Sequence, residues 1–132
     1  GVALTKFIFW LKTKKKLDIT EVDAQNKLEY FRKQNPNYLF PSFDTIAGTG
    51  KNGAIVHYRA TKNNTKLLKK NEIFLCDSGG QYKFGTTDVT RTICFKNQNK
   101  KIKDVFTNVL KGHIAVAETD LNKKKNWKIN RY

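Results

Sequence analysis

Two aspartates, Asp77 and Asp88, are the residues whose types and spacing could support catalysis. Asp77 follows four apolar residues at positions 73–76 in a strand-like run. A carboxylate in such a run is costly to bury alone, because its desolvation must be offset by a partner or a metal. The ten residues between the two aspartates predict a hairpin with its turn at 82–85. The sequence therefore predicts two carboxylates on adjacent strands.

The register of this hairpin decides what the two carboxylates can do. A symmetric register would place them roughly opposite each other, with their Cβ atoms about 5 Å apart. Two like charges at that separation repel each other unless a cation lies between them. A divalent cation, or two cations about 3.5–4 Å apart, would satisfy both carboxylates.

A second interpretation of the same residues needs no metal. Asp77 would begin an Asx-type turn with Ser78-Gly79-Gly80, and Asp88 would pair with Arg91 or a lysine. Spacing alone supports the two interpretations about equally. Because side chains alternate along a strand, Asp88 and Arg91 point to opposite faces, and a local ion pair between them is disfavoured.

The chain has two histidines, and neither indicates catalysis by itself. His57 lies in the strand-like run 54–60, where a hydrogen-bonded strand histidine is the default expectation. His113 lies in a predicted helix, where it is expected to be an ordinary surface or core residue.

The other candidate motifs indicate no chemistry. The glycine-containing loop 48–53 opens a strand, and it lacks the Gly-Lys-Ser/Thr ending of a phosphate-binding loop. Cys76 and Cys94 lie in apolar runs, without a Cys-X-X-Cys spacing or a Cys/His cluster. This usage is typical of buried free thiols in a reducing compartment.

Helices are predicted at the start of the chain. Apolar residues recur at helical spacing over 2–11. A second helix is predicted with Thr20 as its N-cap, because acidic residues follow in the first turn. It should bury Val22, Leu28 and Phe31, and should end before Pro36.

Strands follow these helices. They are predicted at 43–48, 54–60, 72–77 and 86–95. Asn99 then caps a last helix, whose apolar stripe contains Ile102, Val105, Phe106, Val109 and Leu110. The order predicts an α+β fold with helices packed on one face of a mostly antiparallel sheet.

Composition narrows the functional classes. The 132 residues carry a net charge of +15, but the basic residues are 22 lysines and 4 arginines, accompanied by 13 asparagines. Specific nucleic-acid readers rely on arginine, so a solvated lysine-rich surface is the preferred interpretation over a nucleic-acid binder. No apolar stretch is long enough to span a membrane. We therefore expect one cytoplasmic domain that binds neither a specific nucleic acid nor a membrane.

Several segments together resemble one family, aminopeptidase P (X-prolyl aminopeptidase). The similar segments are 75–82 and 85–92 around the two aspartates, 40–48 and 52–58 before them, and 20–24 and 109–115 in the predicted helices. The resemblance implies the pita-bread (creatinase/aminopeptidase) fold. It also divides the chain into 1–118, the N-terminal part of a metallopeptidase catalytic domain, and 119–132, a divergent basic tail.

The resemblance assigns a role to three residues. Asp77 would bind one of two divalent metals, and Asp88 would bind both. The metals are expected to be manganese, with zinc or cobalt as alternatives. His57 matches a family histidine that lines the substrate site, whereas His113 matches no catalytic position. The implied substrates are peptides with proline as the second residue, and a homodimer is expected because the family often dimerises through its catalytic domain.

The chain also departs from the family pattern. The remaining family ligands, one histidine and two glutamates, lie beyond the segment that this sequence matches. We therefore expect a fragment of a dinuclear-metal X-prolyl aminopeptidase that is inactive as this chain alone, and a piece of a longer product. The alternative is a non-catalytic pita-bread module that binds peptides or proteins, although the presence of Asp77, Asp88 and His57 speaks against it.

Overall fold

The computed structural model describes residues 1–119, which fall into two compact units. The first unit comprises residues 1–97, and the second begins at Gln98 and contains helix α3. Apart from Thr119, the predicted tail at 119–132 lies outside the described residues. No helix among residues 1–119 is both long and apolar enough to cross a membrane.

Two helices open the first unit, as predicted. Helix α1 spans Val2–Thr13 and helix α2 spans Glu21–Lys33, so α2 ends before Pro36. The predicted cap of α2 is a complete capping box. The Thr20 hydroxyl accepts from the Asp23 amide at 3.1 Å, and the Asp23 carboxylate accepts from the Thr20 amide at 2.9 Å. These two bonds satisfy amides that the helix cannot pair internally.

The buried stripe of α2 differs from the predicted one. Leu28 is buried as expected, but Val22 and Phe31 are only half-buried. The other buried residues of the helix are Ala24 and two charged residues, Glu21 and Arg32. Glu21 finds hydrogen-bond donors inside the fold, and Arg32 donates to the Ser78 hydroxyl through Nη2, although its Nη1 is buried without a partner among the described residues. These bonds offset part of the desolvation cost of the two charged side chains.

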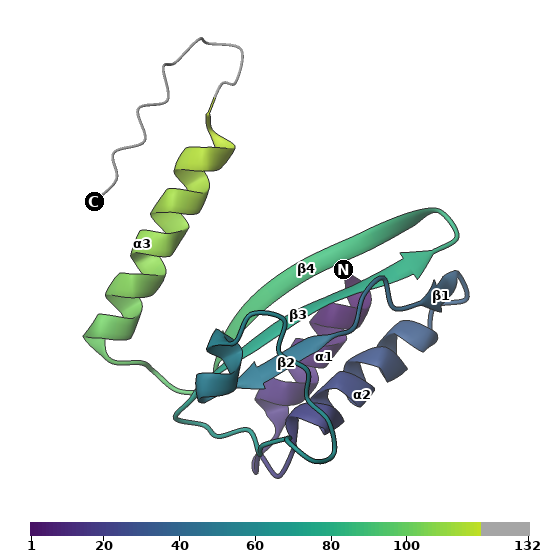
Figure 1. The fold of residues 1–132 in the computed structure, drawn as a ribbon, viewed down its shortest axis with the longest axis horizontal. Coiled ribbons are helices and arrows are strands. Elements are labelled where there is room, and N and C mark those ends of the chain that lie inside the picture. Colours follow the sequence, from purple (N-terminus) through teal and green to yellow (C-terminus); the bar gives the residue numbers. More distant parts are fainter. Residues whose placement is uncertain (120–132) are drawn as a thin grey trace. The chain divides into compact units, whose positions relative to one another are not determined.

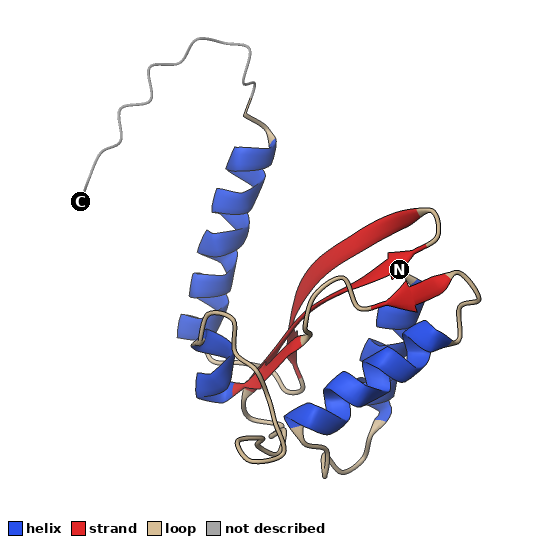
Figure 2. Cartoon of the chain, turned by 45° about the vertical axis from the view of Figure 1, so that its right-hand side comes forward, coloured by secondary structure: helices blue, strands red, loops and turns tan. Residues whose placement is uncertain are grey.

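The sheet is antiparallel and has four strands. Strands β3 (Ile73–Tyr82) and β4 (Gly85–Cys94) form the predicted hairpin. Strands β1 (Tyr38–Phe40) and β2 (Ile46–Thr49) both pair with β3, near its end and its beginning respectively. Figures 1 and 2 show α1 and α2 together on one side of this sheet. The predicted α+β arrangement is confirmed.

The core lies between these two helices and the sheet. Phe74 and Cys76 of β3 are buried, and the Phe7 ring of α1 lies 6.4 Å from the Phe74 ring. Leu11, Leu28 and Ile93 belong to the same cluster. Because side chains alternate along β3, Leu75 and Asp77 point to the opposite face. We call this opposite face, away from α1 and α2, the open face.

The predicted strand at 54–60 is wrong. Residues Gly50–Ala54 form a short 3-10 helix, η1, and a turn follows it in which the Tyr58 amide donates to the Ile55 carbonyl at 3.2 Å. The chain curls here because Gly48 and Gly53 touch. A Cβ atom on Gly48 would lie 2.7 Å from the Gly53 nitrogen. Strand β1 was not predicted, and β2 begins later than the predicted strand at 43–48.

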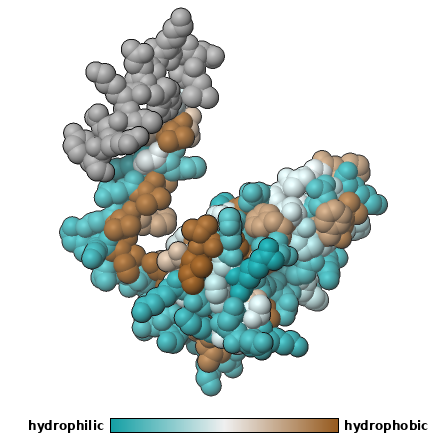
Figure 3. Space-filling view, viewed as in Figure 1, coloured by the Kyte–Doolittle hydropathy of each residue, from teal (hydrophilic) through white to brown (hydrophobic). Residues whose placement is uncertain are grey.

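Helix α3 spans Lys100–Ala117 and confirms the predicted last helix. The Asn99 side chain accepts from the Ile102 amide at 3.0 Å, as an N-cap should. The helix has an apolar stripe and no buried residue, and Figure 3 shows apolar side chains along its surface. The most exposed members of the stripe include Val105, Phe106 and Val109.

Candidate metal centre

The hairpin places Asp77 and Asp88 on the same face of the sheet. Asp77 pairs with Thr90, and Asp88 pairs with Gly79. The two aspartates are therefore diagonal neighbours rather than directly opposite, because Asp77 pairs two residues beyond Asp88 on the partner strand. Diagonal neighbours lie about 7 Å apart, within joint reach of a bound cation or a pair of cations.

The two carboxylates have different surroundings. Asp77 is half-buried, and its Oδ1 atom is buried without a hydrogen-bond partner. Asp88 is exposed. Neither aspartate belongs to an ion pair among residues 1–119. A buried carboxylate oxygen without a donor is costly, and a cation is the partner that would remove this cost.

The metal-free interpretation does not fit this structure. Strand β3 continues through Asp77-Ser78-Gly79-Gly80, so Asp77 begins no Asx turn. Arg91 pairs with Cys76 in the register, on the face opposite to Asp88, and its guanidinium donates to the Thr90 carbonyl at 2.8 Å. The predicted separation of Asp88 and Arg91 is confirmed.

Close packing holds the hairpin at the level of the aspartates. A Cβ atom on Gly79 would lie 2.0 Å from the Thr87 carbonyl oxygen and 2.1 Å from the Ser42 hydroxyl. The Ser42 hydroxyl itself donates to that carbonyl at 2.9 Å. On the helix side, the buried Arg32 donates to the Ser78 hydroxyl at 2.9 Å. The strand that follows Asp77 is therefore fixed by neighbouring elements from both faces of the sheet.

The donor set suits a hard divalent cation but is small. Carboxylate oxygens are the ligands that manganese, magnesium and calcium prefer. Within residues 1–119, no group of three or more His, Cys, Asp or Glu side chains is placed to hold a metal. Asp77 and Asp88 therefore fit part of a metal centre whose other ligands would have to come from elsewhere.

His57 lies in the turn that follows η1. It is exposed, and it has a φ of 56°, the only positive φ at a non-glycine residue in the described part of the chain. This left-handed conformation is uncommon outside glycine, although histidine is one of the residues that tolerate it. No hydrogen bond joins His57 to either aspartate among the described residues. His113 is an exposed residue of α3, as expected.

A buried carboxylate that was not predicted from the sequence anchors this turn. Glu21 is 0% exposed and accepts hydrogen bonds from four residues. The donors are the Thr49 amide at 2.8 Å, the Lys66 amide at 3.0 Å, the Tyr58 hydroxyl at 2.8 Å, and the Asn52 amide group, which reaches both oxygens at 3.0 and 3.1 Å. Burial and the bond to Glu21 together raise the pKa of Tyr58 to about 12.

Helical spacing could have identified this carboxylate. Glu21, Ala24, Leu28 and Arg32 recur at intervals of three and four, and they are the buried residues of α2. A glutamate and an arginine in phase with an apolar stripe indicate buried polar groups that need partners. The partners themselves, Asn52 and Tyr58, carried no signal in the sequence.

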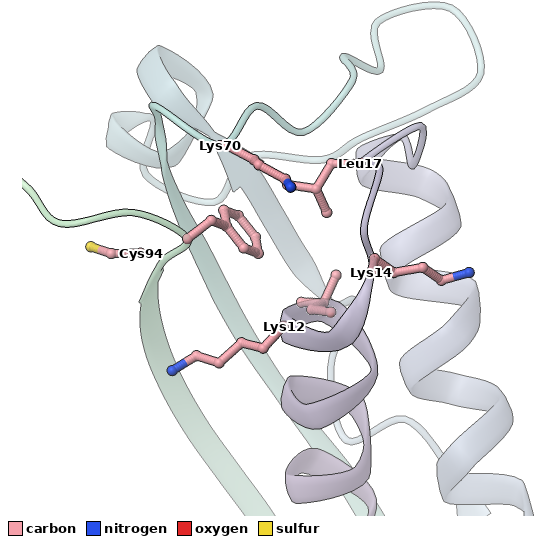
Figure 4. Close-up of a pocket in the computed structure, with 7 residues that line it drawn as sticks. Lys12, Lys14, Leu17, Lys70 and Cys94 are labelled. Carbon is pink, nitrogen blue, oxygen red and sulfur yellow. The ribbon is translucent and has the colours of Figure 1, made fainter.

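A hollow at the end of α1 contains several lysines but does not form an anion site. Its lining includes Lys12, Lys14, Lys70 and Cys94. Figure 4 shows that the amino groups of Lys12 and Lys14 point away from each other and away from the hollow. Lys70 is engaged with the Lys15 carbonyl at 2.7 Å. The lysines therefore do not converge on one ligand.

Comparisons with known proteins agree on one family. A probable Xaa-Pro aminopeptidase P of Paracoccidioides brasiliensis is 45% identical over 119 residues, which cover 88% of this chain and 19% of the relative. A protein of the same description from Podospora anserina is 46% identical, with 88% and 18% covered. The chain thus spans about a fifth of the length of these relatives.

The fold also matches solved structures. X-prolyl aminopeptidase from Caenorhabditis elegans, described as a cytosolic enzyme with a di-nuclear active site, superposes with a TM-score of 0.80 at 38% identity, covering 89% of this chain and 20% of that one. Xaa-Pro dipeptidase from Bacillus anthracis gives a TM-score of 0.71 at 27% identity, with 86% and 30% covered. The described fold is therefore part of the pita-bread fold. Residues 1–127 match the model of metallopeptidase family M24, and the chain belongs to this family.

Proposed function

We propose that the chain is a fragment of an X-prolyl aminopeptidase, whose complete form releases the N-terminal residue from peptides with proline at the second position. The observation that carries this proposal is the pair of aspartates on one sheet face, with a buried Asp77 oxygen that has no donor. The Xaa-Pro aminopeptidase P relatives supply the substrate class.

Asp77 and Asp88 are the metal ligands in this proposal. Two divalent metals, manganese by preference, would supply Lewis-acid polarisation of the scissile carbonyl and an activated water. The fixed backbone of β3 would hold the Asp77 carboxylate in place, and Asp88 would reach the metals from the exposed strand β4. His57, at the tip of an exposed turn, would contact and position the peptide. We propose a cytosolic location, as described for the Caenorhabditis elegans enzyme.

The chain alone should not be an active peptidase. Two carboxylates leave most coordination positions of a divalent metal unfilled, so affinity should be low and the metal poorly fixed. Purified chain with added manganese should therefore not cleave an X-Pro peptide. Cleavage that persists after removal of contaminating enzyme would overturn this expectation.

Metal binding itself tests the proposed site. Calorimetric titration with Mn²⁺ should show weak binding to the chain, and Asp77→Asn or Asp88→Asn should each reduce the affinity at least about tenfold, because ligand charge dominates the affinity of such sites. Asp104→Asn is the matched control, since Asp104 is an exposed aspartate of α3 paired with Lys100. Equal binding by all four proteins would contradict the proposed site.

A further inference from the structure

We propose that Glu21 is a positioning residue, which clamps the loop of residues 52–58 at both ends and so fixes the turn that presents His57. The role of His57 toward a peptide rests on the proposed function. The clamp itself rests on contacts within the first unit.

Both ends of this loop bind the same carboxylate. Asn52 donates to Glu21 at 3.0 and 3.1 Å, and Tyr58, six residues later, donates at 2.8 Å. The two loop residues are also joined directly, because the Asn52 side-chain amide lies 2.8 Å from the Tyr58 hydroxyl. A loop whose ends meet at one buried point has little freedom to open, because each opening breaks several hydrogen bonds to a charged acceptor.

The clamp is fixed in turn by the rest of the first unit. Glu21 is the first residue of α2, where the helix dipole favours a negative charge. The Thr49 amide at the end of β2 and the Lys66 amide complete the donor set. The Lys66 ammonium donates to the side-chain amide oxygen (Oδ1) of Asn52 at 3.0 Å, which brings a positive charge close to the carboxylate. Four residues between positions 49 and 66, all at least 28 residues from Glu21 in the sequence, therefore converge on this carboxylate.

The loop between the clamped ends points outward. Ile55 is 53% exposed and Val56 is 82% exposed, and His57 follows in the left-handed conformation. A left-handed backbone at a residue other than glycine persists where the surrounding structure fixes it. The carboxylate holds a conformation that the local sequence does not favour, so His57 depends on Glu21 for its place.

A matched pair of tyrosines allows a direct test. Tyr58→Phe removes one hydroxyl from the Glu21 clamp. Tyr38→Phe removes a hydroxyl that donates at 2.7 Å to Glu29, another glutamate of α2 outside the clamp. Amide hydrogen exchange and the imidazole resonances of the two histidines would be measured by NMR in the full chain, with His113 as an internal reference.

In Tyr58→Phe, the amide at position 58 should exchange at least about tenfold faster, the expected effect of losing a hydrogen bond to a charged group. The His57 imidazole resonances should shift while those of His113 stay unchanged. Tyr38→Phe should leave both the loop amides and His57 unchanged. A purely structural role would instead give the same response at His57 in both variants, or none, and either result would overturn the proposal.

Failure of this proposal and failure of the metal site are distinguishable. Tyr58→Phe should bind Mn²⁺ like the parent chain, because the aspartates lie on β3 and β4. If Mn²⁺ binding is absent from the parent chain, the exchange result still decides whether Glu21 holds the His57 turn. Because Glu21→Gln could prevent folding, Tyr58→Phe is the primary variant.

Discussion

Glu21 and Asp77 are both removed from solvent, at least in part, but their carboxylates differ in the hydrogen bonds that they receive. Glu21 is fully buried and receives hydrogen bonds from four residues. Asp77 has one oxygen that is equally inaccessible and receives none. The two residues carry the same functional group in the same folded unit, so the difference lies in the donors that the fold supplies.

This difference separates a structural carboxylate from a candidate ligand. A buried charge that is fully hydrogen-bonded holds segments together, and removing it leaves its donors unpaired. A buried oxygen without a donor destabilises the metal-free fold and is retained where something else supplies the partner. The comparison therefore predicts opposite responses when each acidic group is removed.

The largest effect is expected at Glu21. Replacing Glu21 by Ala leaves two backbone amides and two side chains without their acceptor, and should lower the free energy of unfolding by about 3–5 kcal/mol. Urea denaturation followed by circular dichroism would measure this loss. Glu29→Ala is the control on the same helix, because Glu29 is only half-buried and binds one tyrosine and Lys33. A similar loss of unfolding free energy in Glu21→Ala and Glu29→Ala would contradict the special structural role of Glu21.

A smaller effect of opposite sign is expected at Asp77. In EDTA, Asp77→Asn should leave the free energy of unfolding unchanged or raise it by up to about 1 kcal/mol, because the amide removes an uncompensated charge. Saturating Mn²⁺ should reverse the order, since a metal that binds only the folded state stabilises the parent chain. A marked loss of stability in EDTA would place Asp77 in the same class as Glu21.

The smallest effect is expected from chemical labelling of the two cysteines, which report on the two faces of the sheet. Cys76 is buried on the helix side, and burial raises its pKa to about 11. Cys94 is exposed, and its pairing with Ile73 places it on the open face. At pH 8 a disulfide reagent should therefore label one thiol rapidly, and peptide mapping should identify it as Cys94. Rapid labelling of both thiols would contradict the assignment of the faces.

Local signals predicted much of the fold. The Thr20 cap, the end of α2 before Pro36, the hairpin and the Asn99 cap each depend on residues close in the sequence, and the structure confirms them. The strand predicted at 54–60 failed because its conformation is set from a distance. Tyr58 and Asn52 turn toward Glu21, more than 30 residues earlier, and no local pattern reports that contact.

The candidate site was predicted in part. The sequence identified Asp77 and Asp88, placed them on adjacent strands and located the turn at 82–85, but it left the register open, with directly opposite aspartates as the symmetric case. The observed register depends on the turn, in which Tyr82 pairs with Gly85 and leaves two residues at the tip. Relative to the symmetric register this is a shift of two residues, which keeps both aspartates on one face and changes them from opposite to diagonal. Their assignment as metal ligands stays a prediction.

The most direct test of the proposed metal site is to locate where Mn²⁺ binds. In NMR spectra of the labelled chain, small amounts of Mn²⁺ broaden the resonances nearest to the bound ion first. We predict that resonances of Asp77, Gly79, Asp88 and Thr90 disappear at the lowest Mn²⁺ ratio, and that Asp77→Asn abolishes this order. Early broadening elsewhere, with the hairpin resonances retained, would contradict it.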